Sequence, residues 1–188
     1  MATKHSREEM LSGALDAALE GGLSRLTFGR LASRLQISDR MVVYYFPTKD
    51  DLLTSVLSVV GDRLQHVLSA AFPTPMNDHR SLVAAAWPVV AKPEYDPLFG
   101  LYFEAIGQAT AGLEPYRSVA SLLVEGWIEW LSGFVVGSPD HRRMEATAAV
   151  ALLDGLLLMR LLGGSDLAAT ASTSLLNTGG SQRERPSS

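Results

Sequence analysis

The spacing of apolar residues predicts that helices make up most of the chain. In the amino-terminal part, four apolar residues recur at helical spacing: Phe28, Leu31, Ala32 and Leu35. They predict a short amphipathic helix over residues 28–35. Ser38 is a favourable N-cap for a second short helix, Asp39–Tyr45, which Phe46-Pro47 ends. Two short helices joined by a tight turn form a helix-turn-helix.

Capping residues and helix breakers delimit the remaining helices. Ser6 and Glu9 form a capping box at the start of a first helix, which ends at Gly21-Gly22. The segment Thr48–Asp51 forms a second capping box and starts a long helix that ends before Pro73. Proline and glycine breaks predict five more helices, over residues 81–91, 98–109, 115–136, 140–162 and 165–176. Since no strand-like alternation persists, the expected fold is all-α, with about nine helices and no sheet.

Charge is distributed unevenly along the chain. The formal net charge is −4, yet the segment from Arg25 to Lys49 contains five basic residues and one acidic residue. A basic face on an acidic body is typical of a specific DNA-binding protein with a separate regulatory part. Lys49 is placed at a helix N-terminus, where the macrodipole disfavours a cation. Either Lys49 and nearby backbone amides hold a phosphate, or Lys49 is a solvated surface lysine.

Residues 26–53 resemble the DNA-binding domain of the TetR (tetracycline-repressor-like) family of transcription regulators. The matching positions are Leu26-Thr27, Leu31-Ala32, Ile37-Ser38, Val42, Tyr45-Phe46-Pro47-Thr48-Lys49 and Leu52-Leu53. Two positions depart from the family pattern. Gln36 replaces the usual Gly, so it must accept a turn geometry that Gly adopts more easily. Val43 replaces a Tyr that the family places near a phosphate, so Tyr44 or Tyr45 must supply that contact.

The resemblance implies a two-part layout and a set of DNA contacts. We expect residues 5–65 to form the TetR-type helix-turn-helix domain and residues 66–178 a helical ligand-binding and dimerisation domain. Residues 179–188 lack apolar side chains and are expected to be a disordered tail. The predicted DNA-binding residues are Thr27, Arg30, Arg34, Ser38, Asp39, Arg40, Met41, Tyr44, Tyr45 and Lys49.

These residues have different expected roles. Five of them should face the major groove: Ser38, Asp39, Arg40, Met41 and Tyr44. There, Arg40 can pair with guanine, Met41 can contact a thymine methyl group, and Asp39 can accept from cytosine N4. Three others should hold phosphates: Thr27, Tyr45 and Lys49. Arg30 and Arg34 lie four residues apart on one helix face, an arrangement that is tolerable if an anion lies outside.

A wide apolar stripe runs along the predicted helix 140–162. Small residues within it, Ala148, Ala151 and Gly155, allow another helix to approach closely. From the residues alone, the stripe fits a core helix and a surface shared with a partner equally well. The family resemblance implies that the last two helices form a four-helix interface between two copies. The predicted interface residues are Ala148, Ala151, Leu152, Gly155, Met159 and Leu162.

Aromatic side chains are concentrated between Ser81 and Val136. At helical spacing, such residues are ordinarily core filling. The family resemblance adds that regulators of this kind hold a small molecule between these helices. The predicted pocket residues are Trp87, Phe99, Phe103, Glu104, Trp127 and Trp130. Glu104 either favours a ligand with a cationic or hydroxyl group or points to water.

The sequence contains no signature of an enzyme or of a membrane protein. It has no cysteine, no P-loop and no GxGxxG motif. Asp62 and His66 lie four residues apart and could share a metal ion, but a metal site needs at least one more ligand. The longest apolar run, 146–162, includes Asp154 and Arg160, so we expect no membrane span and a cytoplasmic protein. We therefore predict a non-enzymatic homodimeric repressor without cofactor, which binds double-stranded operator DNA and is released by a small-molecule effector. The alternative is a helix-turn-helix regulator without such a ligand, controlled by a partner or by abundance.

Overall fold

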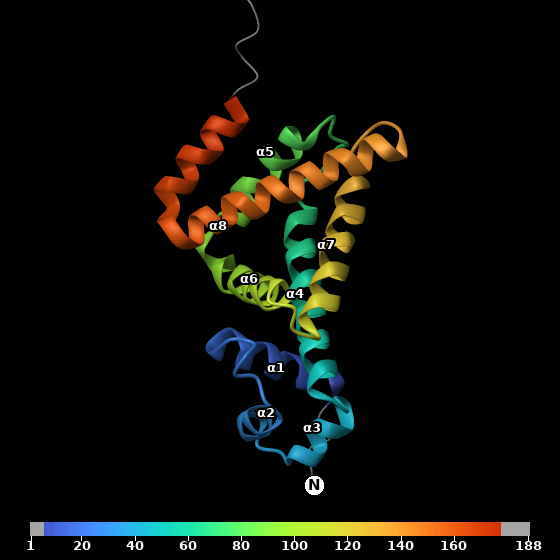
Figure 1. Cartoon of the computed structure of the whole chain (residues 1–188), viewed down its shortest axis with the longest axis vertical. Coiled ribbons are helices and arrows are strands. Elements are labelled where there is room, and N and C mark those ends of the chain that lie inside the picture. Colours follow the sequence, from blue (N-terminus) through green and yellow to red (C-terminus); the bar gives the residue numbers. More distant parts are fainter. Residues whose placement is uncertain (1–5, 178–188) are drawn as a thin grey trace, which may run out of the picture. The chain divides into compact units, whose positions relative to one another are not determined.

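The structure is a computed structural model that describes residues 6–177 (Figure 1). Its helices are α1 (Arg7–Gly21), α2 (Phe28–Leu35), α3 (Asp39–Tyr45), α4 (Lys49–Ser69), α5 (His79–Val90), α6 (Asp96–Thr110), α7 (Tyr116–Ser132) and α8 (Pro139–Asn177), with a 3-10 turn, η1 (Pro93–Tyr95), before α6. The described residues form no strand, only an isolated bridge between Met76 and Val135. The predicted all-α fold is confirmed, while the predicted tail 179–188 lies outside the described residues.

Both predicted capping boxes are present. The Ser6 hydroxyl accepts from the Glu9 N–H at 3.1 Å, and the Glu9 carboxylate accepts from the Ser6 N–H at 2.8 Å. At the start of α4, the Thr48 hydroxyl accepts from the Asp51 N–H at 3.0 Å, and the Asp51 carboxylate accepts from the Thr48 N–H at 2.9 Å. These bonds satisfy N–H groups that a helix start leaves without partners, so the two helices begin where the sequence predicts.

The turn between α2 and α3 depends on Gln36. This residue has φ 55° and ψ 42°, the left-handed conformation, and its N–H donates back to the carbonyls of Ala32 and Ser33. The prediction that Gln36 takes the geometry usually given to Gly is therefore confirmed. The conformation ends α2 and lets α3 start at Asp39 after a short turn.

The predicted helices 140–162 and 165–176 are the two arms of α8. The helix bends at Gly164, whose φ of 85° and ψ of 174° are not helical, and the bend is visible in the orange-to-red ribbon of Figure 1. A residue with a side chain rarely adopts this conformation, which explains why the break falls on a glycine. The sequence thus predicted the break itself, although the two arms follow each other without a loop.

By length and composition, one helix within residues 6–177 could cross a membrane, namely Pro139–Leu176 in α8. About a third of its most apolar window, 33%, is buried within the protein. A core helix of a globular protein passes the same test, so this finding is weak evidence for a membrane span. The break at Gly164 and the packing of α8 on α5 fit a helix of a folded domain.

The helices pack into two compact units, each with its own core. The first comprises residues 6–67 and 94–126, and the second residues 68–93 and 127–177. This division differs from the predicted boundary at residues 65/66, because α6 packs on α1 and so joins the amino-terminal helices. The assignment of functions to residues 5–65 and 66–178 stays a prediction.

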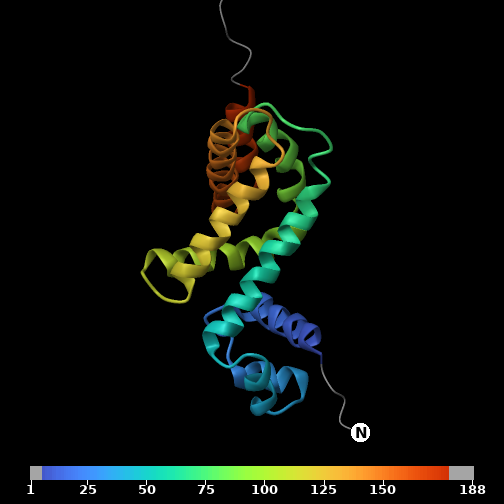
Figure 2. The same cartoon turned by 90° about the vertical axis from the view of Figure 1, so that its right-hand side faces the viewer.

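The first unit has a helical core centred on the amino-terminal helices. Helix α1 packs on α2 and α3 at the start of α4, as Figure 2 shows. Fully buried side chains from these helices and the following turn fill the space between them: Met10, Leu15, Leu31, Val42 and Phe46. Packing in this core fixes the positions of α2 and α3 relative to α1.

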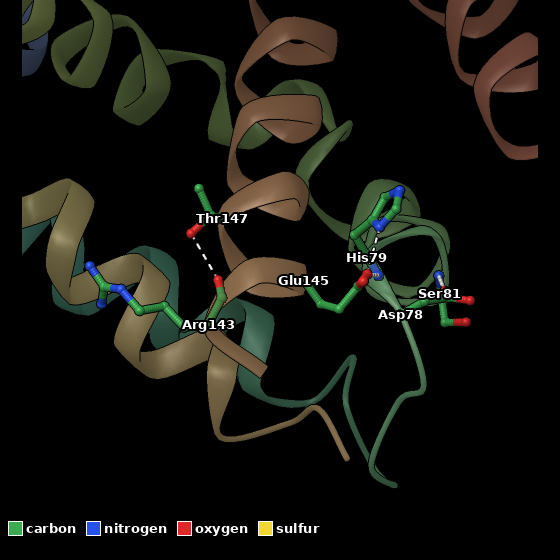
Figure 3. A network of polar contacts seen from close by, with 6 residues as sticks. All are labelled: Asp78, His79, Ser81, Arg143, Glu145 and Thr147. Atoms are coloured by element: carbon green, nitrogen blue, oxygen red, sulfur yellow. Dashed lines mark hydrogen bonds and ion pairs between the residues drawn. The ribbon is translucent and has the colours of Figure 1, made fainter. Parts of the chain in front are cut away.

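In the second unit, α5 and α8 are joined by packing and by the contacts of Glu145 with His79. The Glu145 carboxylate on α8 accepts from the backbone N–H of His79 at 2.7 Å and lies 2.6 Å from its ring Nδ1 (Figure 3). Asp78 caps α5 by accepting from the Ser81 N–H at 2.8 Å. Because the donated N–H groups lie at the start of α5, both carboxylates also interact favourably with its dipole.

Candidate nucleic-acid interface

Helix α3 has one inward and one outward face. Val42 is fully buried against the core, whereas Tyr44 is 75% exposed and Met41 39% exposed. Asp39 and Arg40 in the first turn are also exposed. A seven-residue helix with a single buried anchor leaves most of its side chains available to a ligand outside the protein. The residues predicted to face the major groove are thus brought together on one exposed surface.

Two hydroxyl residues stand at the starts of α2 and α3. The Thr27 hydroxyl accepts from the Arg30 N–H at 3.3 Å and caps α2. Ser38 occupies the N-cap position of α3 but makes no side-chain capping bond. Since a hydroxyl that accepts can still donate its proton, Thr27 can cap α2 and donate to a phosphate as well. Both side chains are exposed, as a DNA contact requires.

The two tyrosines at the end of α3 contact each other. Their rings meet edge to face at 89° with centroids 5.1 Å apart. Tyr45 is half-buried, so Tyr44 is the more accessible of the two for a groove contact. The ring contact restricts both side chains, which lowers the entropy that either would lose on binding.

The arginines on α2 differ in their surroundings. Arg34 forms a two-bond ion pair with Glu20 on α1, at 2.6 and 2.8 Å, and the hydrogen bond from Arg34 lowers the pKa of the Glu20 carboxyl. Arg30 is exposed, and its guanidinium lies beside Gly21. Sequence reasoning missed Glu20 as the partner of Arg34, because the two residues meet only when α1 packs on α2. A phosphate must therefore compete with a carboxylate for Arg34.

Lys49 is the first residue of α4 and is exposed. Its neighbour Thr48 and Asp51 form the capping box, which uses the Thr48 and Asp51 N–H groups. The lysine cation is therefore exposed at a helix start, where the helix dipole disfavours a positive charge. An anion bound from outside the protein would stabilise this arrangement.

A comparison with protein families gives a match over these helices. The family model described as "Bacterial regulatory proteins, tetR family" matches residues 10–56, which contain α1, α2, α3 and the start of α4. Residues 10–56 therefore match the DNA-binding domain of the TetR family. A comparison with curated proteins by sequence yields no match.

Several solved structures, among them a putative TetR-family regulator, have a similar fold. A putative TetR-family regulator from Rhodococcus sp. superimposes with a TM-score of 0.72 at 17% identity, covering 90% of this chain and 94% of that one. A putative transcriptional regulator from Saccharomonospora viridis in complex with choline gives 0.63 at 20% identity, covering 91% and 93%. The multidrug binding protein EbrR complexed with proflavin gives 0.67 at 23% identity, covering 90% and 96%. At these identities, the likeness establishes the fold.

The predicted pocket residues are divided between the two compact units. Phe99 is buried and Phe103 half-buried on α6, in the first unit. Trp87 on α5 and both Trp127 and Trp130 on α7 belong to the second. The two α7 tryptophans meet edge to face with centroids 5.6 Å apart. Trp130 also contacts two phenylalanine rings in this unit: Phe72 and Phe134.

Glu104 has a partner that neither interpretation of the sequence anticipated. Its carboxylate accepts from the backbone N–H groups of Leu23 at 2.8 Å and Ser24 at 2.9 Å, in the loop between α1 and α2. Burial, together with the charges of Glu104 and Asp50, raises the pKa of Tyr116 nearby. No sequence signal could have indicated the loop contact, because it joins residues about 80 positions apart.

The predicted dimer residues form a mostly exposed stripe on α8. Leu162 is 80% exposed and Met159 47% exposed, and Ala151 and Gly155 are exposed as well. Ala148 and Leu152 are half-buried at the edge of the stripe. The opposite side of the same helix is buried, with Leu153, Leu156 and Leu157 in the core.

A groove in the first unit was not predicted. It has a volume of about 440 Å³ and is lined by Val59, Asp62, Arg63, His66, Val67, Glu94, Tyr95 and Leu98. Asp62 and His66 both lie there, but residues 6–177 contain no group of three or more His, Asp or Glu placed to hold a metal ion. The groove is therefore a surface feature whose lining includes acidic, basic and apolar side chains.

Proposed function

We propose that this chain is a homodimeric repressor that binds operator DNA in the cytoplasm and is released from it by a small-molecule ligand. The observation that carries the DNA-binding role is the outward face of α3, where Val42 anchors the helix and the predicted base-contacting residues are exposed. Around it stand the exposed Thr27 and Lys49, placed at the starts of α2 and α4. Phosphate contacts at helix starts with base contacts from one short helix are the mode of helix-turn-helix proteins.

The exposed stripe of α8 supports the homodimer. Two predicted interface residues, Met159 and Leu162, and two further apolar residues of α8, Met144 and Leu158, are between 42% and 80% exposed. Leaving such a row in water is unfavourable, and a second copy of the same stripe would cover it. Two recognition helices then read two half-sites. A single seven-residue helix contacts too few bases for useful affinity, so two copies are needed.

The proposal that a ligand releases the protein from DNA is supported by the molecules bound in structures of similar fold. EbrR binds proflavin in one structure, and the Saccharomonospora viridis regulator binds choline in another. Both molecules are organic cations, so organic cations are the first class to test. Aromatic side chains such as those of α6 and α7 would suit cations of this kind.

One observation favours the alternative of a regulator without a small-molecule ligand. The rings of Trp127, Trp130, Phe72 and Phe134 contact one another, with centroid separations between 4.8 and 5.8 Å. Contacts of this kind fill space, as expected of a solid core. Control by a partner protein or by abundance would then replace control by an effector.

The deciding experiment is footprinting of the purified full-length protein on genomic DNA, repeated with organic cations and a panel of neutral and acidic compounds. The proposal predicts protected sites with two-fold symmetric half-sites and an affinity that falls as salt rises. At least one compound should abolish protection. Protection that no compound changes would support the alternative, and absence of salt-dependent affinity for any duplex would contradict DNA binding itself.

A further inference from the structure

Glu104 connects α6 to the loop between α1 and α2. One carboxylate oxygen, Oε2, accepts from the Leu23 N–H at 2.8 Å, and the other, Oε1, accepts from the Ser24 N–H at 2.9 Å. The carboxylate thus binds two consecutive backbone donors at once, which fixes both the position and the orientation of this part of the loop. A charged acceptor makes such bonds stronger than a neutral one would.

Gly22 makes room for this contact. Its φ is +82°, a value that side chains rarely allow, and a Cβ atom there would lie 2.9 Å from Oε2 of Glu104. A side chain at position 22 would strain the backbone and crowd the carboxylate, so this close approach favours glycine. The contact between the carboxylate and the loop therefore depends on two residues far apart in sequence, Gly22 and Glu104.

The loop held by Glu104 leads directly into the DNA-binding surface. Leu23 and Leu26 are buried, and the Leu26 N–H donates to the Leu23 carbonyl at 3.1 Å. Thr27 follows at once as the N-cap of α2. Fixing Leu23 and Ser24 therefore fixes where α2 begins, and with it the expected phosphate contact of Thr27.

We infer that Glu104 is a positioning residue for DNA binding, which acts by holding the α1–α2 loop and so the start of α2. The inference rests on the proposed DNA-binding function. It is distinct from a role in the ligand pocket, because both carboxylate oxygens are committed to the loop.

Charge alone predicts the opposite result for a Glu104 variant. Replacing a carboxylate by a neutral amide makes the protein less acidic, which should strengthen binding to a polyanion. If Glu104 positions the loop, Glu104→Gln should instead weaken binding. A glutamine side chain has one acceptor oxygen, whereas the N–H groups of Leu23 and Ser24 each need one. The sign of the change separates the two effects.

The test measures the dissociation constant for a footprinted DNA fragment over a range of salt concentrations, well below the unfolding temperature. Glu104→Gln should raise the dissociation constant about tenfold, with an unchanged salt slope, and should speed hydrogen exchange of the Leu23 and Ser24 amides. Glu129→Gln is the matched control, since it removes an exposed carboxylate on α7 and should bind as tightly as the wild type or slightly more tightly.

A double-mutant cycle with Gly22→Ala completes the test. The added methyl group should displace the carboxylate, so Gly22→Ala should also weaken binding, and the double variant should be no weaker than the weaker single variant. If folded Glu104→Gln binds as tightly as the wild type, or more tightly, the inference is wrong while the DNA-binding function stands. If the wild type itself shows no salt-dependent binding, the proposed function fails first.

Discussion

Gln36 and Arg40 meet two different requirements of α3, the proposed recognition helix. Gln36 holds the left-handed turn that separates α2 from α3, and Arg40 extends from the exposed first turn of α3. The first is a conformational requirement on the backbone, and the second is a chemical requirement on a side chain. Substitutions at the two positions should therefore change different quantities, stability in one case and base preference in the other.

At the turn, Gln36→Gly should stabilise the folded chain. A left-handed non-glycine residue carries a steric cost of about 1–2 kcal/mol, part of which the greater backbone entropy of unfolded Gly offsets. We expect a net gain of about 0.5–1 kcal/mol in the free energy of unfolding, measured by urea denaturation. Gln36→Ala is the control, and it should bring no gain because alanine keeps the Cβ atom. A Gly variant less stable than the wild type would contradict this account of the turn.

At the interface, Arg40→Ala and Lys49→Ala should weaken DNA binding in different ways. Lys49→Ala should reduce affinity for all sequences and lower the salt slope by about 1, because a phosphate contact carries no base information. Arg40→Ala should cost about 1–3 kcal/mol on the specific site and relax base preference at one position of each half-site. Binding titrations on the footprinted site and on single-base variants measure both effects. Equal losses on all sequences from both changes would remove Arg40 from base recognition.

Whole elements are held in place by carboxylates that bind helix starts. In the second unit, Glu145 from α8 binds the first residue of α5, and Asp78 caps the same helix (Figure 3). The backbone N–H of His79, followed by its side chain, lowers the pKa of Glu145, and the N–H of Ser81 lowers the pKa of Asp78. Both carboxyl groups are thus easier to protonate in the unfolded chain than in the folded one.

The resulting dependence on pH has a definite sign. Because the folded-state pKa of Glu145 lies below its ordinary value of 4.5, the stabilisation it supplies is present above that pH and is lost as pH falls through the folded-state pKa. The midpoint temperature of thermal unfolding of the wild type should therefore decrease as the pH is lowered below 4.5. Glu145→Gln should start from a lower midpoint at neutral pH and lose less on acidification. Glu129→Gln serves as the control, and an identical acid loss in Glu145→Gln and the wild type would contradict the assignment.

For the whole molecule, the exposed stripe of α8 determines the expected oligomeric state. Leu162→Glu places a charge on the most exposed large apolar residue of the stripe, 80% exposed. In a two-fold interface the change occurs twice, and burying each unpaired carboxylate is unfavourable. The dimer dissociation constant should rise at least about 100-fold, as measured by sedimentation, and affinity for the two-half-site DNA should fall with it.

Leu122 provides the matched control for this prediction. It is a leucine of α7 that is 72% exposed, and it lies outside the stripe. Leu122→Glu introduces the same side chain at a similar exposure and should leave the dimer and DNA binding unchanged. A wild-type protein that sediments as a monomer at all concentrations would contradict the dimer, whereas equal effects of both variants would place the interface elsewhere.

Local sequence was sufficient for everything that depends on near neighbours along the chain. Capping boxes at Ser6 and Thr48, the turn at Gln36 and the break at Gly164 were all predictable, because each depends on residues within a few positions of one another. The residues of α3 that the family resemblance implied for base contact, such as Arg40 and Tyr44, are exposed.

Only the tertiary structure could decide which distant residues meet. It paired Arg34 with Glu20, His79 with Glu145, and Glu104 with the α1–α2 loop, and it grouped α6 with the amino-terminal helices. None of these contacts leaves a periodic signal, because they form when helices pack and each involves only one or two side chains. The sequence therefore determined the helices and their ends, whereas the packing determined the partners of Arg34, Glu145 and Glu104.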